Sequence, residues 1–398
     1  MCKRWISILL LIAAVPLCLR AQTMPQPPEI AASSYLLLDV TANQILAGKD
    51  IDTPVEPASL TKLMTAYLVF DALRLKKIDL GQKLSVSERA WRMPGSRMFI
   101  DPKMKVPVED LLKGMIVQSG NDATVALAEG VAGSVERFVQ LMNDQAKVLG
   151  MASTRYRNPE GLTEAGHTTT ARDLGVLSMR LMRDFPDFVA YYAIKKYRYS
   201  GTPAANDSNR NLLLFRDPTV DGLKTGHTQA AGYCLIASAR RDFPNLAVAG
   251  AKAGSPEAAG SRRLVSVVLG ADSENARANE SQKLLNWGYT AFEAVKLFEA
   301  QQAVISPAIW KGTSSTLKLG QPRSIVVAVP AGSASKLKTE VARQDPIVAP
   351  VAKWQQMATL KVSIGERPLI EIPLLALEPV AEAGLLGRAW DGLRLWIK

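Results

Sequence analysis

Strand-like segments near the N-terminus and in the middle of the chain flank a long stretch of helical periodicity, and this order constrains the fold more than any other feature. The early segments, 34–40 and 44–47, lie on either side of the turn 41–43 and predict a hairpin. Strands separated by a helical stretch bury their apolar faces by sharing one sheet, so the order predicts a single mixed α+β domain. The helical patterns cover 60–74, 108–117, 123–131, 135–149, 171–183 and 273–292, and the later strand patterns cover 197–199, 233–240 and 263–269.

The texture of the sequence changes at about residue 297. Short alternating segments separated by glycine and proline turns predict a small, all-β second domain. A chain of 398 residues is also too long for one ordinary core. We therefore expect a first domain over 30–293 and a second over 297–380. The alternating segments cover 324–329, 337–341, 358–364 and 369–377.

Residues 1–21 have the pattern of a secretory signal peptide. Lys3 and Arg4 precede an apolar run over 5–19, and a small-residue cleavage site ends at Ala21. The pattern predicts export, with an uncleaved membrane anchor as the alternative. Removing the leader leaves 45 basic against 37 acidic side chains, a net charge of +8. This balance favours anionic surfaces, but nucleic acid is not an expected partner, because no run of five basic residues carries interleaved aromatics.

Cysteine and histidine are too scarce for a metal site or a disulfide. Only Cys234 remains after the leader is removed, and it falls in an apolar strand pattern, so we expect a buried, inert thiol. The histidines, His167 and His227, cannot supply a zinc site of usual composition with one cysteine. We expect no metal and no cofactor.

The last segment, 382–398, is amphipathic when wound as a helix. Leucine and tryptophan side chains, among them Leu386, Trp390 and Trp396, fall on one side, and Arg388 and Arg394 fall on the other. The segment is too short and too charged to span a bilayer, so we expect a helix that lies on a membrane surface. A helix docked on the second domain is the alternative.

A possible nucleophile and a possible base stand three residues apart where an extended segment becomes a helix. Ser59 and Lys62 share one face of the first turn, so the lysine can reach back to the hydroxyl. A serine becomes a good nucleophile only when a group takes its proton, and a buried lysine near a helix N-terminus can be neutral enough to do so. Ser-x-x-Lys alone is a weak signal.

Two further segments strengthen this interpretation. Ser119 and Asn121 lie in a tight loop between two helical patterns, where a hydroxyl and an amide project from a fixed corner. Lys224 presents a cation just before an apolar strand pattern, and Gly226 allows close approach of another backbone. The three elements occur in the order that is typical of penicillin-binding proteins and class A β-lactamases.

With these motifs, the chain resembles the low-molecular-mass penicillin-binding proteins that are serine-type D-alanyl-D-alanine carboxypeptidases. The resemblance extends over 94–99, 158–162 and 169–174, and covers nearly the whole chain. Ser119-Gly120-Asn121, in place of Ser-Asp-Asn, is the form usual in these carboxypeptidases. The resemblance implies a β-lactamase/transpeptidase-like domain, an antiparallel sheet with helices and a helical subdomain, followed by the all-β domain and an amphipathic anchor helix.

The resemblance also implies a role for each site residue. Ser59 attacks the substrate, Lys62 takes its proton, and Ser119 relays a proton to the leaving amine. Asn121 binds a substrate amide, and Lys224 and Thr225 bind the terminal carboxylate. Gly226 gives close approach, the backbone of His227 completes an oxyanion hole with that of Ser59, and the His227 imidazole has a supporting role.

The implied reaction removes the terminal D-alanine from peptidoglycan stem peptides through a Ser59 acyl-enzyme, and β-lactams acylate the same serine. The expected location is the periplasmic face of the inner membrane. The alternatives are a β-lactamase or D,D-endopeptidase on the same fold, and a non-catalytic membrane-bound scaffold. Glu160 occupies a loop where class A β-lactamases keep a deacylating glutamate, but we expect an ordinary solvated loop residue. The Ala/Gly-rich stretch 242–261 predicts a surface hairpin extension or a disordered loop.

Overall fold

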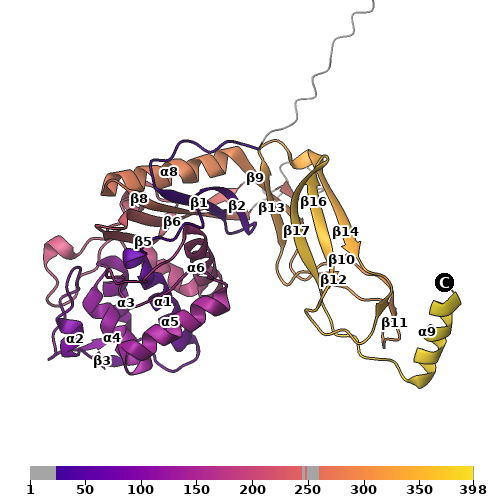
Figure 1. The fold of residues 1–398 in the computed structure, drawn as a ribbon, viewed down its shortest axis with the longest axis horizontal. Coiled ribbons are helices and arrows are strands. Elements are labelled where there is room, and N and C mark those ends of the chain that lie inside the picture. The colour runs from indigo at the N-terminus through magenta and orange to yellow at the C-terminus, as the bar shows by residue number, and fades with distance from the viewer. Residues whose placement is uncertain (1–23, 244–246, 249–259, 398) are drawn as a thin grey trace, which may run out of the picture.

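The computed structural model describes residues 24–243, 247–248 and 260–397. The predicted signal peptide at 1–21 and most of the extension at 242–261 lie outside these residues. Figure 1 shows two bodies side by side, one of helices around a sheet and one made of strands, with a terminal helix beyond the second. Their arrangement follows the order of patterns along the chain.

A five-stranded antiparallel sheet organises the first body. The strand order is β2-β1-β8-β6-β5, so the N-terminal hairpin pairs through β1 with β8, a strand that comes more than 200 residues later. In register, Leu37 of β1 lies opposite Ser266 of β8. The predicted α+β fold with an antiparallel sheet is therefore confirmed. The strands are β1 (Ser34–Asp39), β2 (Gln44–Lys49), β5 (Val220–Thr228), β6 (Gly232–Phe243) and β8 (Gly260–Ala271).

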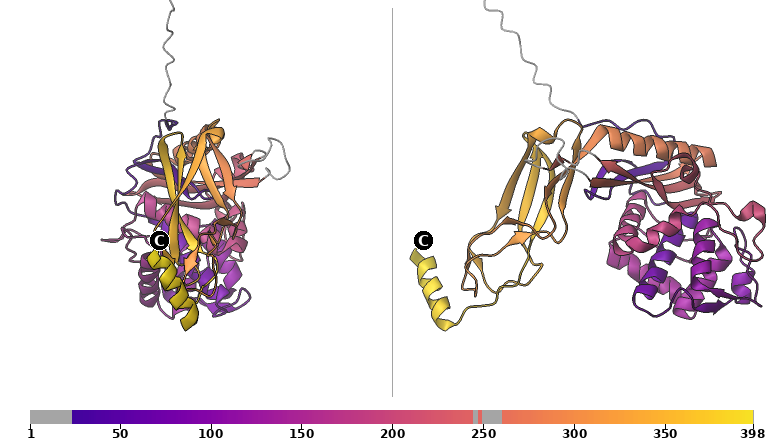
Figure 2. Two further views of the ribbon diagram at one scale, coloured as in Figure 1. Left: turned by 90° about the vertical axis from the view of Figure 1, so that its right-hand side faces the viewer. Right: turned by 180° about the vertical axis from the view of Figure 1, so that it is seen from behind.

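Helices cover both faces of this sheet. One face carries α8 (Glu274–Ala291), and the other carries the helical subdomain, as Figure 2 shows from behind. The Thr170 side chain caps α6 by accepting a 3.1 Å hydrogen bond from the Asp173 amide, as the sequence predicts. The short helix α7 (Leu213–Arg216) packs on the same side as α8. The subdomain contains α1 (Lys62–Arg74), α3 (Val108–Val117), α4 (Asn121–Ala132), α5 (Val135–Leu149) and α6 (Ala171–Asp184), with the short helix α2 (Glu88–Trp91) and the ribbon β3 (Lys83–Ser85) and β4 (Lys105–Pro107).

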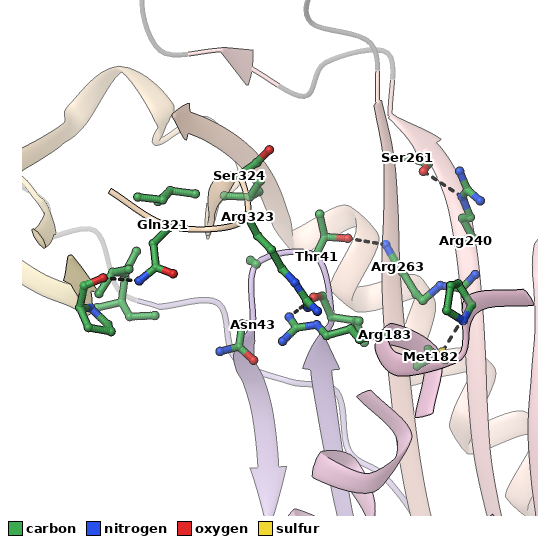
Figure 3. Close-up of a pocket in the computed structure, with 18 of the residues that line it drawn as sticks. Thr41, Asn43, Met182, Arg183, Arg240, Ser261, Arg263, Gln321, Arg323 and Ser324 are labelled. Carbon is green, nitrogen blue, oxygen red and sulfur yellow. Dashed lines mark hydrogen bonds between the residues drawn. The ribbon is translucent and has the colours of Figure 1, made fainter. Parts of the chain in front are cut away.

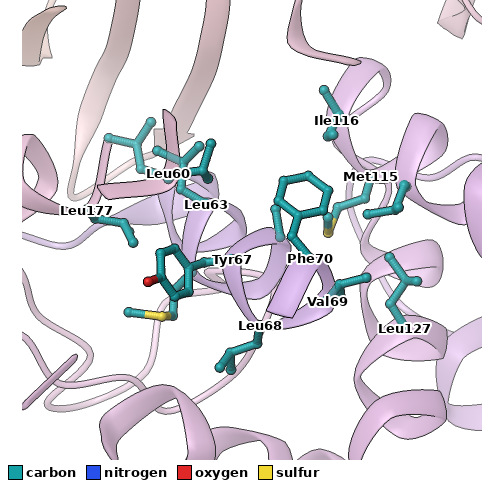
Figure 4. Packing of buried hydrophobic residues seen from close by; sticks show 14 of the residues in the cluster. Leu60, Leu63, Tyr67, Leu68, Val69, Phe70, Met115, Ile116, Leu127 and Leu177 are labelled. Carbon is teal, nitrogen blue, oxygen red and sulfur yellow. The ribbon is translucent and has the colours of Figure 1, made fainter. Parts of the chain in front are cut away.

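Helix α1 is the centre of the larger core. Its buried side chains lie on every side of the helix, which is the pattern of a helix enclosed by others. Figure 4 shows Leu63, Tyr67 and Phe70 pointing in different directions, with Met115 of α3 and Leu177 of α6 among their neighbours. Because α1 is enclosed, its first turn is held rigidly, and that turn carries the Ser-x-x-Lys motif.

The second body has an apolar core between its strands. Val327 of β13, Leu360 of β16 and Leu374 of β17 are buried together in it. One sheet has the order β10-β12-β17-β16-β14, and β13 pairs with β9, which also receives the two-residue strand β7 (Ala247–Val248) in parallel. The strands are β9 (Phe292–Phe298), β10 (Ala303–Ile305), β11 (Ile309–Trp310), β12 (Leu319–Gly320), β13 (Ile325–Pro330), β14 (Leu337–Arg343), β15 (Ile347–Val348), β16 (Gln356–Ile364) and β17 (Arg367–Ala376).

A buried ion pair fixes the junction between the bodies. Arg262 and Asp39 are both fully buried, with 2.7 Å between Nε and Oδ2. The same guanidinium donates a 2.7 Å hydrogen bond to the backbone oxygen of Phe292, where α8 passes directly into β9. Gln44 adds a side-chain bridge to both backbone groups of Ala328.

The terminal helix α9 (Leu385–Ile397) turns its polar side toward the second body. Asp391 accepts a 2.7 Å hydrogen bond from the Lys311 amide, and the Arg394 guanidinium lies 5.5 Å from the Trp310 ring centroid. Leu386 and Trp396 are 89% and 84% exposed. Among the described helices, none has both the length and the apolar character needed to cross a bilayer.

One predicted strand is wrong. Residues 197–199 form no strand, and this region makes only an isolated bridge between Lys196 and Ser208. The reason is a competing set of contacts with α3. The Tyr197 hydroxyl donates a 2.7 Å hydrogen bond to Asp110, and the Gln118 side chain donates to the Tyr197 carbonyl. These bonds hold the segment against a helix and away from the sheet.

Candidate active site

Ser59 lies in a short 3-10 turn, η1 (Ala58–Thr61), that leads directly into α1. The serine is half-buried, whereas Leu60 and Thr61 beside it are fully buried. The Thr61 hydroxyl lies 3.0 Å from His167 Nε2, and this contact ties the turn to the segment before α6. The turn therefore leaves one hydroxyl accessible on a fixed backbone.

Lys62 reaches back to that hydroxyl from the first residue of α1. Its Nζ lies 3.0 Å from Ser59 Oγ, 2.7 Å from Asn121 Oδ1 and 2.7 Å from the backbone oxygen of Glu160. A neutral amine has two N–H donors and one lone pair. If the two carbonyl oxygens take the donors, the lone pair faces the serine proton.

Burial makes the neutral form of Lys62 accessible. The side chain is 2% exposed, and its desolvation lowers the pKa to about 7 against the opposing charges of Glu160 and Asp122. At neutral pH a substantial fraction of the lysine is thus unprotonated. The lysine has both the position and the basicity that a general base requires.

Ser119 and Asn121 enter the site from the corner between α3 and α4. Ser119 has a φ of 59°, an uncommon conformation for a residue with a side chain. Its hydroxyl is buried and makes no hydrogen bond to any described residue. Asn121 is held from its other side, because its Nδ2 donates a 2.7 Å hydrogen bond to the Pro94 carbonyl. One hydroxyl is thus left free beside an immobilised amide.

The third segment is the edge strand β5. Lys224 is 3% exposed and donates a 2.9 Å hydrogen bond to the Thr225 carbonyl. Burial, and then the charge of Lys62, hold the pKa of Lys224 well below its usual range, with smaller contributions from Arg210 and Arg277. The two lysines therefore share one electrostatic environment. Thr225 is also buried, whereas His227 is exposed and stacks on Tyr233 at 4.1 Å between ring centroids.

Gly226 allows β5 to pass close to the turn that carries the serine. A Cβ at this position would lie 3.2 Å from Leu60 Cγ and 3.3 Å from Ala58 Cβ. Any side chain would push the strand away from η1. This contact joins the Lys224 segment to the Ser59 segment, and the hydrogen bond from Lys62 to Asn121 joins the Ser119 segment to them.

Glu160 corrects the sequence analysis, which expected a solvated loop residue. It is 5% exposed, and one of its carboxylate oxygens, Oε2, is buried without a hydrogen-bond partner among the described residues. Burial raises the pKa of this carboxyl. The neighbouring Gly161 explains the burial. It has a φ of +87°, and an added Cβ would lie 1.8 Å from the Ala58 carbonyl oxygen, so the loop packs directly on the serine turn.

Three further residues of the site carried no recognisable sequence signal. Arg277 of α8 is 2% exposed and donates a 3.2 Å hydrogen bond to the Gly226 carbonyl. Arg210 is exposed, and its charge depresses the pKa of both Lys62 and Lys224. Asp122 is fully buried and accepts hydrogen bonds from three successive amides, 98–100, so it shapes the loop above Asn121.

A serine that is hydrogen-bonded to a buried lysine, with a second lysine on the adjacent edge strand, defines a serine hydrolase that works through an acyl-enzyme. Comparison with known proteins narrows this class. Residues 21–253 match the family of D-alanyl-D-alanine carboxypeptidases, and residues 292–382 match the C-terminal domain of penicillin-binding protein 5. The chain belongs to this carboxypeptidase family.

Individual relatives match this chain over almost its full length. The chain is 37% identical to D-alanyl-D-alanine carboxypeptidase DacC of Escherichia coli over 384 residues, which cover 94% of this chain and 91% of that protein. It is 33% identical to DacF of Bacillus subtilis, with 96% of each chain covered. The structure of penicillin-binding protein 5 from Haemophilus influenzae matches with a TM-score of 0.78 at 34% identity, covering 90% of this chain and all of that one. The chain is a serine-type D-alanyl-D-alanine carboxypeptidase, and the resemblance in its motifs is confirmed.

Proposed function

We propose that Ser59 is the nucleophile and Lys62 the base of the carboxypeptidase reaction. The observation that carries the proposal is the set of three short contacts around Lys62 Nζ. Ser59 Oγ attacks the carbonyl carbon between the last two D-alanines as its proton passes to Lys62. The backbone amides of Ser59 and His227 would stabilise the developing oxyanion.

Ser119 is suited to carry the proton onward. Its unpartnered hydroxyl can accept a proton from Lys62 and donate one to the departing amine of D-alanine. The C–N bond then breaks, and the stem peptide remains esterified to Ser59. Water hydrolyses this ester and restores the free serine.

Lys224 and Thr225 would recognise the carboxylate at the end of the substrate. Arg210 and Arg277 add positive charge behind them, and Arg277 is paired with Glu274 at 3.2 Å. The terminal carboxylate of the substrate is negatively charged, so these positive side chains would attract it. Asn121 would orient the substrate amide, and Gly226 keeps the strand close enough for the peptide to bind along β5.

Ser59→Ala tests the assignment directly. The protein is incubated with a pentapeptide that ends in D-Ala-D-Ala, and the products are analysed by mass. We expect loss of one alanine with the wild type, a rate at least about 10⁴-fold lower with Ser59→Ala, and an unchanged rate with the exposed control Ser208→Ala. Turnover by Ser59→Ala at the wild-type rate would refute the role of Ser59.

The same variants separate the alternative activities. A penicillin should add its mass to the wild type and leave Ser59→Ala unmodified, because it mimics the D-Ala-D-Ala unit. Rapid release of hydrolysed penicillin would indicate a β-lactamase, and cleavage of crosslinked peptides in preference to the pentapeptide would indicate an endopeptidase. A protein that still binds vesicles but does not hydrolyse the pentapeptide, react with penicillin or cleave crosslinked peptides would be a scaffold.

We also propose that the protein is exported by its leader, 1–21, and acts at the periplasmic face of the inner membrane, where D-alanine removal contributes to cell wall biogenesis and cell shape. The boundaries proposed for its units are 30–293, 297–380 and 382–398. Helix α9 supports a membrane-surface role, because its polar contacts face the second body while leucines and tryptophans face outward.

Vesicle binding tests the role of α9. We expect the double variant Trp390→Ser/Trp396→Ser to lose at least tenfold in affinity for vesicles that contain phosphatidylglycerol. The matched control is Trp354→Ser, which removes a partly exposed tryptophan of the second body and should bind as the wild type does. Equal binding by all three proteins would refute anchoring through α9.

A further inference from the structure

A cavity of about 680 Å³ opens at the junction between the two bodies, away from Ser59. Its walls come from the turn between β1 and β2, from the end of α6, and from the second body around β13 and β17. None of the proposed catalytic or substrate-binding residues lines it. The carboxypeptidase reaction therefore gives no reason for its chemistry.

Four arginines line the cavity: Arg183, Arg240 and Arg263 from the first body, and Arg323 from the second. Arg263 is paired with Asp221 at 2.6 Å, and Arg240 Nε donates to the Ser261 hydroxyl at 2.8 Å. Glu371 is the only carboxylate among the lining residues, and it forms no ion pair with a described residue. With Asp221 counted as well, four guanidinium groups face two carboxylates, an excess of two positive charges.

Arg183 and Arg323 face each other across the junction (Figure 3). Arg183 donates a 2.7 Å hydrogen bond to the Val40 carbonyl, and burial followed by the charge of Arg323 lowers its pKa. Arg323 makes no hydrogen bond or ion pair with any described residue. Two guanidinium groups from different bodies thus point toward each other, and neither forms an ion pair with a described residue, although the charges of Asp184 and Asp39 also act on Arg183. Such an arrangement is stabilised when an anion binds between the two groups.

We propose that this junction cavity is a binding site for a phosphoryl group, which bridges Arg183 and Arg323 and ties the two bodies together. The planar guanidinium fork matches phosphate oxygens with paired hydrogen bonds. A phosphoryl group carries between one and two negative charges at neutral pH, close to the excess in the cavity, whereas a single carboxylate carries one. The Asn43 amide, at the rim of the cavity, provides a further donor.

The chemistry admits two sources, a free phosphate ion or the headgroup of a phospholipid. Figure 1 shows α9 at the end of the second body that is remote from the junction. A membrane bound through α9 would therefore not lie next to the cavity. The position favours the free ion.

Calorimetric titration of the purified protein with inorganic phosphate tests the site. We expect Arg323→Ala, which changes an exposed side chain, to weaken binding at least tenfold, and Arg183→Gln to do the same. Arg367→Ala removes an exposed arginine of β17 that does not line the cavity, and it should bind as the wild type does. Affinity should fall with added salt. Because Arg323 is not part of the catalytic machinery, Arg323→Ala should hydrolyse the pentapeptide at the wild-type rate.

Hydrogen exchange locates the ion. Phosphate should slow exchange at 40–43 and 321–326 in the wild type and leave both segments unchanged in Arg323→Ala. Titrations with glycerol 3-phosphate and acetate define the ligand: tighter binding of glycerol 3-phosphate identifies a lipid headgroup, and tighter binding of phosphate identifies the free ion.

Three results would overturn the proposal. One is equal phosphate affinity in the wild type and in both arginine variants. Another is acetate binding as tightly as phosphate, which would define a carboxylate site. The last is loss of phosphate binding after acylation by a penicillin, which would place the ion beside Lys224.

Discussion

The two bodies of this protein differ in how many polar side chains they bury. The first encloses Lys62, Lys224, Asp122 and Glu160 near one serine, together with many other buried polar side chains. In the second, Ser333 is the one buried polar side chain among the described residues. Its interior otherwise consists of aliphatic side chains between two sheets.

Because of this difference, we expect the rate of the reaction to depend mainly on the first body and the stability of the protein mainly on the second. Burying an ionisable group costs free energy unless it is paired, so the first body holds a destabilising cluster that its large core must offset. Among the residues that the structure describes, the second body carries no such cluster, and its buried side chains are mostly aliphatic. Substitutions in the first body should therefore affect rate more than stability, and those in the second body should do the reverse.

Among the variants, Lys62→Met should change the rate most, and it should show most clearly that rate and stability respond differently in the first body. Removal of the base should lower the rate of acylation by about 10³-fold or more. The apolar side chain avoids the cost of burying an amine but leaves Asn121 Oδ1 and the Glu160 carbonyl without their donor, so the free energy of unfolding should change by less than about 1 kcal/mol. Penicillin acylation and urea unfolding measure the two quantities. The control is the exposed Lys83→Met, and a large loss of stability in Lys62→Met alone would break the comparison.

Gly161→Ala should give the next largest effect. The new Cβ would collide with the Ala58 carbonyl, so the loop would move off the serine turn and acylation would fall about 100-fold. Gly133→Ala is matched to it, because Gly133 also has a positive φ of +80° but no neighbour within 4 Å of an added Cβ. That control should cost about 1 kcal/mol of stability and leave the rate unchanged. Equal rates in both variants would show that the contact is not needed.

Glu160→Gln should shift the pH dependence of acylation. The active form of Lys62 is neutral, so the rate rises with pH through a pKa of about 7. The charge of Glu160 raises that pKa, so its removal should move the rising limb to lower pH and increase the rate at pH 6. Glu164→Gln changes a carboxyl of the same loop that is not among the charges acting on Lys62, and it should leave the limb in place. A shift of the Glu160→Gln limb to higher pH would contradict the electrostatics.

Val327→Ala should have the smallest effect on rate. Truncation of this fully buried side chain should lower the free energy of unfolding of the second body by about 2 kcal/mol. Hydrolysis of the pentapeptide should not change. Val348→Ala, at a position that is 40% exposed, is the matched control and should cost less than about 0.5 kcal/mol. A loss of activity in Val327→Ala would show that the two bodies are coupled more closely than the contrast implies.

The sequence predicts the parts of this structure that are encoded locally. The helices α3 and α5 have the predicted ends, and the Thr170 cap and the N-terminal hairpin are where the residue pattern places them. The geometry of the Ser59 and Lys62 pair is equally local, because the two residues are three positions apart in the turn that leads into α1. Burial of Cys234 follows from the apolar strand around it, and its exposed fraction is 1%.

Residues whose role depends on distant packing could not be found in this way. Glu160 is buried only because Gly161 meets Ala58, a contact across about a hundred residues of chain. Arg277 has no motif and reaches the site from α8 on the far side of the sheet. The segment 197–199 has a good strand composition, but its tyrosine finds a carboxylate on α3 instead. In each case a long-range contact outweighed the local pattern.

The sheet order also determines when the enzyme can first become active. Strand β1 completes its pairing only with β8, and the serine turn meets its edge strand only after residue 228 exists. Contacts of such long sequence separation form late, because the chain must lose loop entropy before they contribute. A nascent chain that already carries Ser59 is therefore inert, and its nucleophile acquires a working environment only as folding ends.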